Sequence, residues 1–429
     1  YGGFIMKKLL TLLLTAMLAV ACCFGFTACG EKSDVKIGLI CLHGETSTYD
    51  KNFIDAMKKA CEVKGADLVI KTDIPEDEKC YEAAIDLVSQ GCQAIFADSF
   101  GHEQYILKAA KEKPDVQFYH ATGTTAHTEN VANFHNAFAN IYQGRYVAGY
   151  AAGMKLAEMV KDKTETAYKV GYVGAFPYAE VKSGYTSWFL GLRKAFAEYA
   201  EGKTVTMEVK FTNSWYNETG EKEAANALIQ SGCLLISQHA DSWGAPTACE
   251  DAGVPNVSYN GSTISKCPNT FIISSRINWQ PYYELIIDAV RDSKKAVPAD
   301  WTSGFGSLYT AKEGSVCVTE LGNAAAEGTA EALDKLVYDI KYNGLKVFDC
   351  DTFTVTKTDT KNVNATVDEN GKLLQYKADV NTDAAFTADT EVVKEIKNEK
   401  GEVIKRYFAE SEFRSAPYFD IDIDGIIIK

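Results

Sequence analysis

The stretch that decides the fold is Ala83-Ala84-Ile85-Asp86-Leu87-Val88-Ser89-Gln90-Gly91-Cys92, which continues to Asp98-Ser99-Phe100-Gly101. The chain repeats it as Ala224-Ala225-Asn226-Ala227-Leu228-Ile229-Gln230-Ser231-Gly232-Cys233, which continues to Asp241-Ser242-Trp243-Gly244. Each copy predicts a helix that ends at a glycine and is followed by a short apolar strand of the kind found in buried parallel sheets. We therefore expect two related α/β lobes.

The polar end of each copy marks the expected ligand site. In open α/β sheets, ligands lie at the carboxyl ends of the strands. Asp98-Ser99-Phe100 and Asp241-Ser242-Trp243 follow directly on their predicted strands, so two such ends facing each other would form a cleft. For Ser99 and Ser242, capping of the next helix is the alternative role.

The remainder of the chain continues the alternation of strand and helix up to about residue 347. This alternation predicts a parallel, doubly wound sheet in each lobe. The first lobe is expected to span 34–148 and 274–302, and the second 149–273 and 303–347. The apolar run Ile272-Ile273-Ser274-Ser275 is expected to return to the first lobe, so that the chain crosses the hinge several times.

Residues 348–429 differ in pattern and are predicted to form a β-rich appendage that covers one lobe. Thr352 to Thr356 alternates in polarity, Glu369-Asn370-Gly371 is a turn signal, and Leu373 to Tyr376 could pair back. This segment carries no catalytic pattern.

Composition excludes several classes of protein. The chain has 429 residues, of which 46% are hydrophobic and 24% charged, as in soluble proteins of two or three domains. Its formal charge of -14 argues against a nucleic-acid partner. The 12 cysteines show no C-x-x-C spacing and the six histidines form no cluster, so we expect buried thiols, no metal site and no cofactor.

The first 28 residues are predicted to be a leader and an export signal rather than part of the fold. Lys7 and Lys8 precede the apolar stretch Leu9 to Ala28, and small residues then precede Cys29, which resembles a bacterial lipoprotein signal with lipidation at Cys29. Phe26 departs from that pattern, and a retained membrane-spanning helix is the alternative.

Translation is expected to start at Met6, because Met6-Lys7-Lys8 is how such signals begin. Tyr1 to Ile5 would then be untranslated leader. Cys22, which follows Ala19-Val20-Ala21, is the less favoured processing site.

The predicted strand ends are rich in flat rings and amides and poor in paired acids and bases. This inventory suits the binding of a flat, uncharged ligand by ring stacking and by hydrogen bonds to its edge. The chain lacks the nucleophile elbow G-x-S-x-G and a phosphate-binding loop, so we expect a binding protein and not an enzyme. The candidate ligand-binding residues are Tyr49, Asp50, Asn52, Phe53, Ser99, Phe100, His120, Trp215, Gln238, His239, Asp241, Asn260, Asn278 and Trp279.

Several of these residues have an alternative structural role. Trp215 and Phe53 could belong to the core. His120 and His239 could be buried histidines with internal hydrogen bonds, and Asp50 could cap the following helix.

Five groups of residues together carry a family resemblance: Tyr49-Asp50-Lys51-Asn52-Phe53, Ala109-Ala110-Lys111 with Pro114 to Phe118, Gly144 to Gly149, Val170 to Gly174, and Asn213-Ser214-Trp215 with Gly220 to Ala225. Through them the chain from Lys36 to about Val347 resembles the basic membrane protein family of bacterial lipoproteins, the purine nucleoside receptors of ABC transporters. That resemblance implies a type I periplasmic-binding-protein fold that closes on a purine, with the base between one ring from each lobe. Tyr49 or Phe53 and Trp215 occupy those positions here, and Asp50, Asn52 and Ser99 would read the base edge.

The departures from the family pattern favour a free nucleobase. Nucleoside-binding members grip ribose with an acid and a lysine, whereas this chain has Tyr259-Asn260 and Asn278-Trp279 in those regions. Ser99-Phe100-Gly101, His120 to Gly123 and Gln238 to Ser242 are similar to a branch of the family that binds adenine-like bases.

The sequence thus predicts a monomeric lipoprotein on the extracytoplasmic face of the cell membrane that delivers a purine, a nucleobase or else a nucleoside, to an ABC-transporter permease. A receptor for another flat or polyhydroxylated ligand, such as a flavin or sugar, is one alternative. A purine-processing hydrolase or deaminase is another, for which His120, His239 and Asp241 are the candidate acid-base groups.

Overall fold

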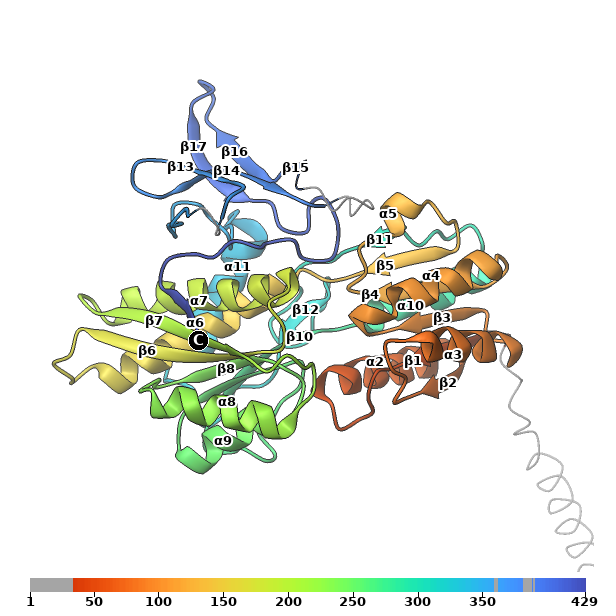
Figure 1. Cartoon of the computed structure of the whole chain (residues 1–429), viewed down its shortest axis with the longest axis horizontal. Helices are drawn as coiled ribbons and strands as arrows, with labels where there is room; N and C mark the ends of the chain where they lie inside the picture. Colours follow the sequence, from red (N-terminus) through yellow and green to blue (C-terminus); the bar gives the residue numbers. More distant parts are fainter. Residues whose placement is uncertain (1–33, 359–361, 381–387, 389) are drawn as a thin grey trace, which may run out of the picture. The chain divides into compact units, whose positions relative to one another are not determined.

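Two parallel sheets organise the chain, as the computed structural model shows for residues 34–358, 362–380, 388 and 390–429 (Figure 1). The predicted signal segment and Cys29 lie outside these residues. Nine cysteines of the described ranges are buried and unpaired, which confirms the expectation of buried thiols. Among the helices described, none combines the length and the apolar character needed to cross a membrane.

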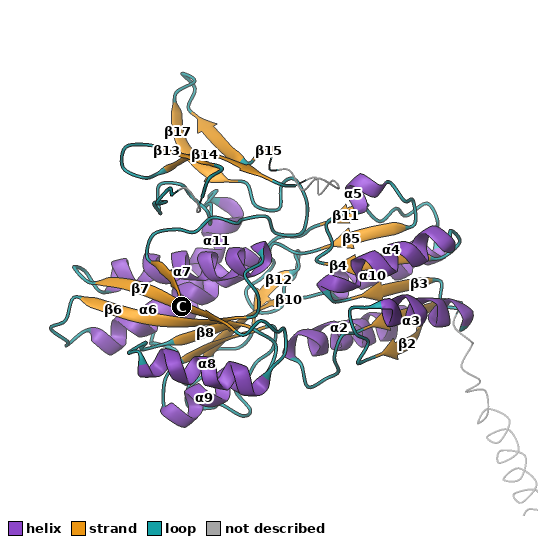
Figure 2. Ribbon diagram, in the orientation of Figure 1, coloured by secondary structure: helices purple, strands orange, loops and turns teal. Residues whose placement is uncertain are grey.

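The first lobe is built on a six-stranded sheet with the order β11-β5-β4-β3-β1-β2, in which neighbouring strands are parallel. Helices pack on this sheet (Figure 2). The strands are β1 (Lys36–Ile40), β2 (Asp67–Lys71), β3 (Ala94–Ala97), β4 (Gln117–Ala121), β5 (Phe134–Ala137) and β11 (Asp300–Trp301). The helices are α2 (Thr48–Lys64), α3 (Glu78–Ser89), η1 (Phe100–His102), α4 (Glu103–Glu112), α5 (Ala126–Glu129) and α10 (Gln280–Arg291).

The second lobe is built on a seven-stranded sheet with the order β12-β10-β9-β8-β6-β7-β18. Only β12 runs antiparallel among the strands of this sheet that the structure describes. The strands are β6 (Ala167–Gly174), β7 (Thr204–Phe211), β8 (Ile236–His239), β9 (Asn256–Tyr259), β10 (Phe271–Ile277), β12 (Val316–Val318) and β18 (Ile426–Ile428). The helices are α6 (Ile141–Val160), α7 (Ala179–Tyr199), α8 (Glu218–Gln230), α9 (Gly244–Ala252) and α11 (Thr329–Tyr342).

The repeated sequence forms the same unit in both lobes, as predicted. Helix α3 is followed by Gly91 at φ 85°, and α8 by Gly232 at φ 95°, a left-handed conformation that favours glycine. Strands β3 and β8 then run in parallel with β1 and β6. Both polar segments therefore leave the carboxyl ends of their sheets.

The prediction for Ile272 to Ser275 is wrong. These residues belong to β10, which pairs with β9 and β12 in the second lobe, so the chain returns to the first lobe only after Ile277. A strand that is buried along nearly its whole length, as β10 is, carries no signal for the sheet that it joins. The exact bounds of the two lobes stay a prediction.

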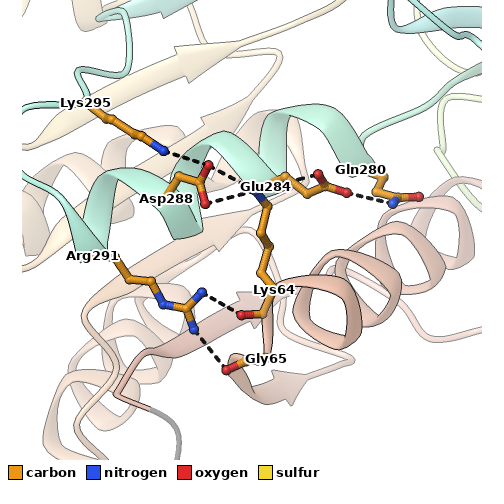
Figure 3. Close-up of polar contacts among 7 residues, drawn as sticks. All are labelled: Lys64, Gly65, Gln280, Glu284, Asp288, Arg291 and Lys295. Atoms are coloured by element: carbon orange, nitrogen blue, oxygen red, sulfur yellow. Dashed lines mark hydrogen bonds and ion pairs between the residues drawn. The ribbon is translucent and has the colours of Figure 1, made fainter.

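Helix α10 then packs on α2 through the polar contacts drawn in Figure 3. Arg291 donates from Nη1 to the carbonyl of Lys64 at 2.6 Å and from Nη2 to that of Gly65 at 3.0 Å, at the negative end of α2. Asp288 pairs with Lys64 at 2.9 Å and with Lys295 at 3.1 Å. These contacts fix the returning segment on the first lobe.

The appendage is β-rich, as predicted, but its pairing differs from the expectation. Thr352 to Thr356 forms no strand, and Leu373 to Tyr376 lies in β14, which pairs with β13 and β15. The final strand β18 leaves the appendage and joins β7 of the second lobe in parallel. The appendage strands are β13 (Ala365–Val367), β14 (Leu373–Ala378), β15 (Thr390–Glu391), β16 (Val393–Lys397) and β17 (Val403–Phe408).

Candidate ligand-binding site

A cavity with about 360 Å³ of space between atoms, part of it open to solvent, lies between the strand ends of the two lobes. We call it the inner cavity. Its walls combine rings with carboxyl groups from both lobes. The lining residues are Leu42, Tyr49, Asp50, Ser99, Phe100, Thr122, Glu180, Trp215, His239, Asp241 and Tyr259.

Asp50 lies in the first turn of α2 and lines the cavity. Ser47, the N-cap of α2, accepts a hydrogen bond from the backbone amide of Asp50 at 3.1 Å and donates its hydroxyl to Asp50 Oδ2 at 2.5 Å. Asp50 Oδ1 accepts the backbone amide of His43 at 2.7 Å. The capping role that the sequence left open for Asp50 therefore belongs to Ser47.

Asp98 lies behind Asp50 and is fully buried. Its Oδ1 accepts the amide of Leu42, while Oδ2 has no partner among the described residues. Burial, and next the charge of Asp50, raise the pKa of Asp98 well above its ordinary value. The Asp98 carboxyl therefore keeps its proton to higher pH than a solvent-exposed aspartate does.

Cys41, Asp50 and Asp98 place their candidate ligand atoms within 4.8 Å of one another. Burial raises the pKa of the Cys41 thiol, and metal binding needs the thiolate. The Asp50 oxygens already accept hydrogen bonds from His43 and Ser47. The donor set does not suit a cation, and we assign no metal to it.

The second lobe contributes Trp215, His239, Asp241, Glu180 and Tyr259 to the wall. The Asp241 amide donates to the carbonyl of Trp215 at 2.9 Å, which links the two segments that follow β7 and β8. Asp241 is also one point of contact between the lobes, because its backbone carbonyl accepts the backbone amide of Thr48 at 3.0 Å and the Thr48 hydroxyl at 3.2 Å.

The acids of the second lobe are desolvated. Burial raises the pKa of Glu180 to about 7, and the charge of Arg145 partly opposes this. Burial also raises the pKa of Asp241 well above its ordinary value, and the charges of Asp50, Glu221 and Glu180 add to the shift. Burial lowers the pKa of His239 well below its ordinary value, so the imidazole is neutral. A ligand that donates hydrogen bonds to these carboxyl groups would replace the water that they have lost.

Arg145 lies outside the cavity wall. Its guanidinium stacks 3.3 Å from the ring centroid of Tyr259 and donates from Nη1 to the Gln238 carbonyl at 2.9 Å. Neither lysine nor arginine is among the residues that line the inner cavity.

Most hydroxyl donors at the wall are already engaged. Tyr49 donates to the Asp98 carbonyl at 2.7 Å, Ser99 to Glu76 at 2.6 Å, and Thr122 to the Ala121 carbonyl at 2.5 Å. The Asp241 carboxyl, by contrast, accepts no hydrogen bond from the described residues, and Glu180 has only His239 at 3.4 Å. The cavity therefore offers mainly acceptors to a ligand.

Half of the predicted binding residues line the inner cavity. They are Tyr49, Asp50, Ser99, Phe100, Trp215, His239 and Asp241.

Four others do not line the inner cavity and form hydrogen bonds within the protein. Asn52 donates to the carbonyl of Ile277 at 2.8 Å. His120 contacts the carbonyl of Ser99 at 2.7 Å, and Gln238 accepts from Asn256 at 3.2 Å. The backbone amide of Asn260, a residue at φ 63°, donates to the backbone carbonyl of Ser275 at 2.9 Å.

Phe53, Trp279 and Asn278 serve the scaffold. Phe53 stacks on Trp279 with ring centroids 4.6 Å apart, and both side chains are fully buried in the first lobe. Asn278 accepts the amide of Gln280 at 3.1 Å at the start of α10. The apolar surroundings of these two rings account for their burial, so we leave all three residues out of the proposed site.

Leu42, Thr122, Glu180 and Tyr259 line the cavity although the sequence did not single them out as binding residues. Tyr259 is the last residue of β9, a position where the strand-end rule could have found it. Glu180 lies in the first turn of α7, six residues after β6 ends at Gly174. No local sequence pattern marks it as a binding residue.

Two doubly wound lobes joined by several crossings, with a cavity at their facing strand ends, define the type I periplasmic-binding-protein fold. The chain belongs to the Bmp family, described as PnrA-like ABC transporter substrate-binding proteins, whose model matches residues 45–347. This membership confirms the family inferred from the sequence and the expectation of a binding protein rather than an enzyme.

Individual relatives match shorter segments of the chain than the family model does. A purine-binding protein of Brucella abortus is 34% identical over 193 residues, 45% of this chain and 50% of the relative. TsgA13 of Haloferax volcanii, provisionally named an ABC transporter glucose-binding protein, is 32% identical over 221 residues, 51% of this chain and 52% of the relative. The chain thus spans about half the length of the curated relatives it matches.

Among solved structures, a solute-binding protein of an ABC transporter system from Aeropyrum pernix K1 has a TM-score of 0.56 at 16% identity. The match covers 76% of this chain and 94% of that structure. It supports the fold.

Proposed function

We propose that this protein is an extracytoplasmic receptor that captures a free purine base between its lobes and delivers it to an ABC-transporter permease. The observation that carries this proposal is the acceptor-rich inner cavity with rings from both lobes. Tyr49 and Trp215 line it from opposite lobes and would stack on the two faces of the base. Asp50, Asp241 and Glu180 would accept hydrogen bonds from its N–H groups.

The same chemistry favours a base over its nucleoside. A free purine carries a ring N–H that glycosylation replaces, and a cavity of carboxyl acceptors benefits from each donor. The inner cavity also lacks a lysine that could grip ribose hydroxyls. The purine-binding relative from Brucella abortus supports the purine class.

The proposed location rests on the N-terminal sequence, in which Cys29 would carry the lipid anchor. Mass spectrometry of protein extracted from membranes tests this part alone. A mature chain that begins at a diacylated Cys29 is the expected result, and an unmodified Cys29 would remove the anchor from the proposal.

Calorimetric titration tests the ligand. Protein that has been unfolded and refolded to remove bound ligand is titrated with adenine, guanine, hypoxanthine, their nucleosides, riboflavin and glucose. We expect a base to bind at least about tenfold more tightly than its nucleoside, the effect of one lost buried hydrogen bond. Tighter binding of a nucleoside would overturn the preference for a base. Binding of glucose or riboflavin without any purine would overturn the purine class.

A further inference from the structure

A second cavity adjoins the inner cavity and contains about 1310 Å³ of space between atoms. We call it the outer cavity. Both lobes and the appendage line it. Phe100, Thr122 and Glu180 line both cavities, so the two spaces meet at these residues.

Aromatic rings stand at this junction. Phe100 from the first lobe and Tyr178 from the second have ring centroids 5.7 Å apart. They are 41% and 44% exposed. Their exposed faces offer a stacking surface at the entrance of the outer cavity.

The appendage is fixed to both lobes, so its side of the cavity is part of the folded protein. Lys182 of α7 pairs with Asp420 at 2.6 Å. The amide of Ser415 donates to Oδ2 of Asp300, in β11 of the first sheet, at 2.8 Å. The segment that matches the Bmp family model ends at residue 347, before the residues of this wall.

The appendage wall combines apolar and aromatic side chains with charges of both signs. Ala378, Ala416, Tyr376 and Tyr418 contribute the first group, and Lys377, Asp379 and Asp420 the second. The guanidinium of Arg414 also lies there, but it donates to the carbonyls of Asp379, Ala416 and Pro417. Its hydrogen-bonding capacity is largely used within the appendage, which suits an uncharged occupant.

We propose that the outer cavity binds an uncharged, ring-bearing substituent on the exocyclic amine of a purine whose base occupies the inner cavity. This inference rests on the proposed function and extends it to a class of substituted aminopurines. A substituted exocyclic amine keeps one N–H, which Glu180 accepts at the junction. Substitution at the ring nitrogen that carries the sugar in nucleosides removes the only N–H at that position.

The test compares adenine with two benzylated adenines by calorimetry on the full mature chain. One carries the benzyl group on the exocyclic amine and the other on the sugar-bearing ring nitrogen. We expect the first to bind at least as tightly as adenine and the second to bind about tenfold or more weakly. Binding of adenine with about a hundredfold loss for the amine-substituted compound would overturn the inference and leave the proposed function standing. Failure of adenine itself to bind would overturn both.

Two variants assign the effect to the outer cavity. Tyr178→Ala should weaken the amine-substituted compound by about three- to tenfold through lost stacking and leave adenine unchanged. Ala179→Trp should narrow the outer cavity, which Ala179 lines, and exclude the substituted compound while adenine still binds. Tyr199→Ala is the control, because Tyr199 is 53% exposed at the other end of the same helix. Equal effects of Tyr178→Ala and Tyr199→Ala would overturn the assignment.

Discussion

At the scale of single residues, the partners of each side chain in the site leave one of its groups free to contact a ligand. The Tyr49 hydroxyl donates to the Asp98 carbonyl, so its ring face is the part that remains for a ligand. Asp241 uses its backbone to link the lobes, which leaves its carboxyl group for a ligand. Residue type alone did not predict which group of each side chain is free for a ligand, because that depends on the hydrogen-bond partners that each group has in the structure.

Trp215→Ala should weaken base binding by about 1–3 kcal/mol, because the second stacking face is lost. Calorimetry with the preferred base measures the change. Trp243→Ala is the matched control, since Trp243 follows the same strand end as Asp241 and does not line the inner cavity. An unchanged affinity for the Trp215 variant would take this ring out of the site.

Glu180 should make base binding depend on pH. Its pKa of about 7 means that the carboxyl group is largely protonated at pH 5 and ionised at pH 8. An N–H donor binds the ionised form better, so binding should lower this pKa and release protons. Affinity should therefore rise between pH 5 and 8 and then level off.

Titration in two buffers of different ionisation enthalpy counts the protons released. In Glu180→Gln both the proton release and the pH dependence of affinity should diminish. A variant that keeps the full pH dependence would assign it to other groups.

At the scale of elements, the sequence predicted the units that carry a local signal. The repeated sequence predicted, in both lobes, a helix that ends at a glycine, a strand and then a polar segment. Both polar segments lie at the inner cavity. The sequence could not predict that β10 stays in the second lobe, since a short buried strand fits either sheet. Nor could it separate Phe53 from Tyr49, because their difference in role depends on the partner ring Trp279 from a distant segment.

Helices α6 and α7 approach so closely that side chains are excluded at their crossing. A Cβ atom on Gly149 would lie 1.9 Å from the carbonyl oxygen of Trp188, and one on Gly191 would lie 2.0 Å from that of Tyr146. Gly149→Ala should therefore force the helices apart and destabilise the fold by about 1–3 kcal/mol, despite the higher helix propensity of alanine.

Urea unfolding measures this change in stability. Gly44→Ala is the control, because its added Cβ would meet only Thr72, at 4.0 Å. Equal stability of the Gly149 variant and the wild type would show that the helices can separate without cost.

At the scale of the whole molecule, buried glutamates set the dependence of stability on pH. Burial raises the pKa of Glu180 and Glu221 to about 7 and that of Glu410 to about 8. Between pH 4.5 and these values the folded state holds protons that the unfolded chain has released. The contribution of these glutamates to the free energy of unfolding should therefore fall as pH rises through this window, by up to about 1.4 kcal/mol per pH unit for each group. Buried histidines such as His102 and His239, whose pKa burial lowers, act in the opposite direction below about pH 6.5, so the fall should be clearest between pH 6.5 and 8.

Urea unfolding at pH 5, 6.5 and 8 tests this slope. Glu180→Gln should reduce the slope, whereas Glu327→Gln, at an exposed position, should leave it unchanged. A wild-type stability that rises steadily from pH 5 to 8 would contradict the prediction.

The return of β18 to the edge of β7 has a consequence for how the protein tolerates truncation. A chain cut after residue 347, where the family match ends, would lose the strand that covers β7. The bare edge of β7 would then present unpaired amide and carbonyl groups, which readily recruit a strand from another molecule. The C-terminal segment thus protects the second lobe from self-association, and a shortened protein should aggregate before its capacity to bind can be measured.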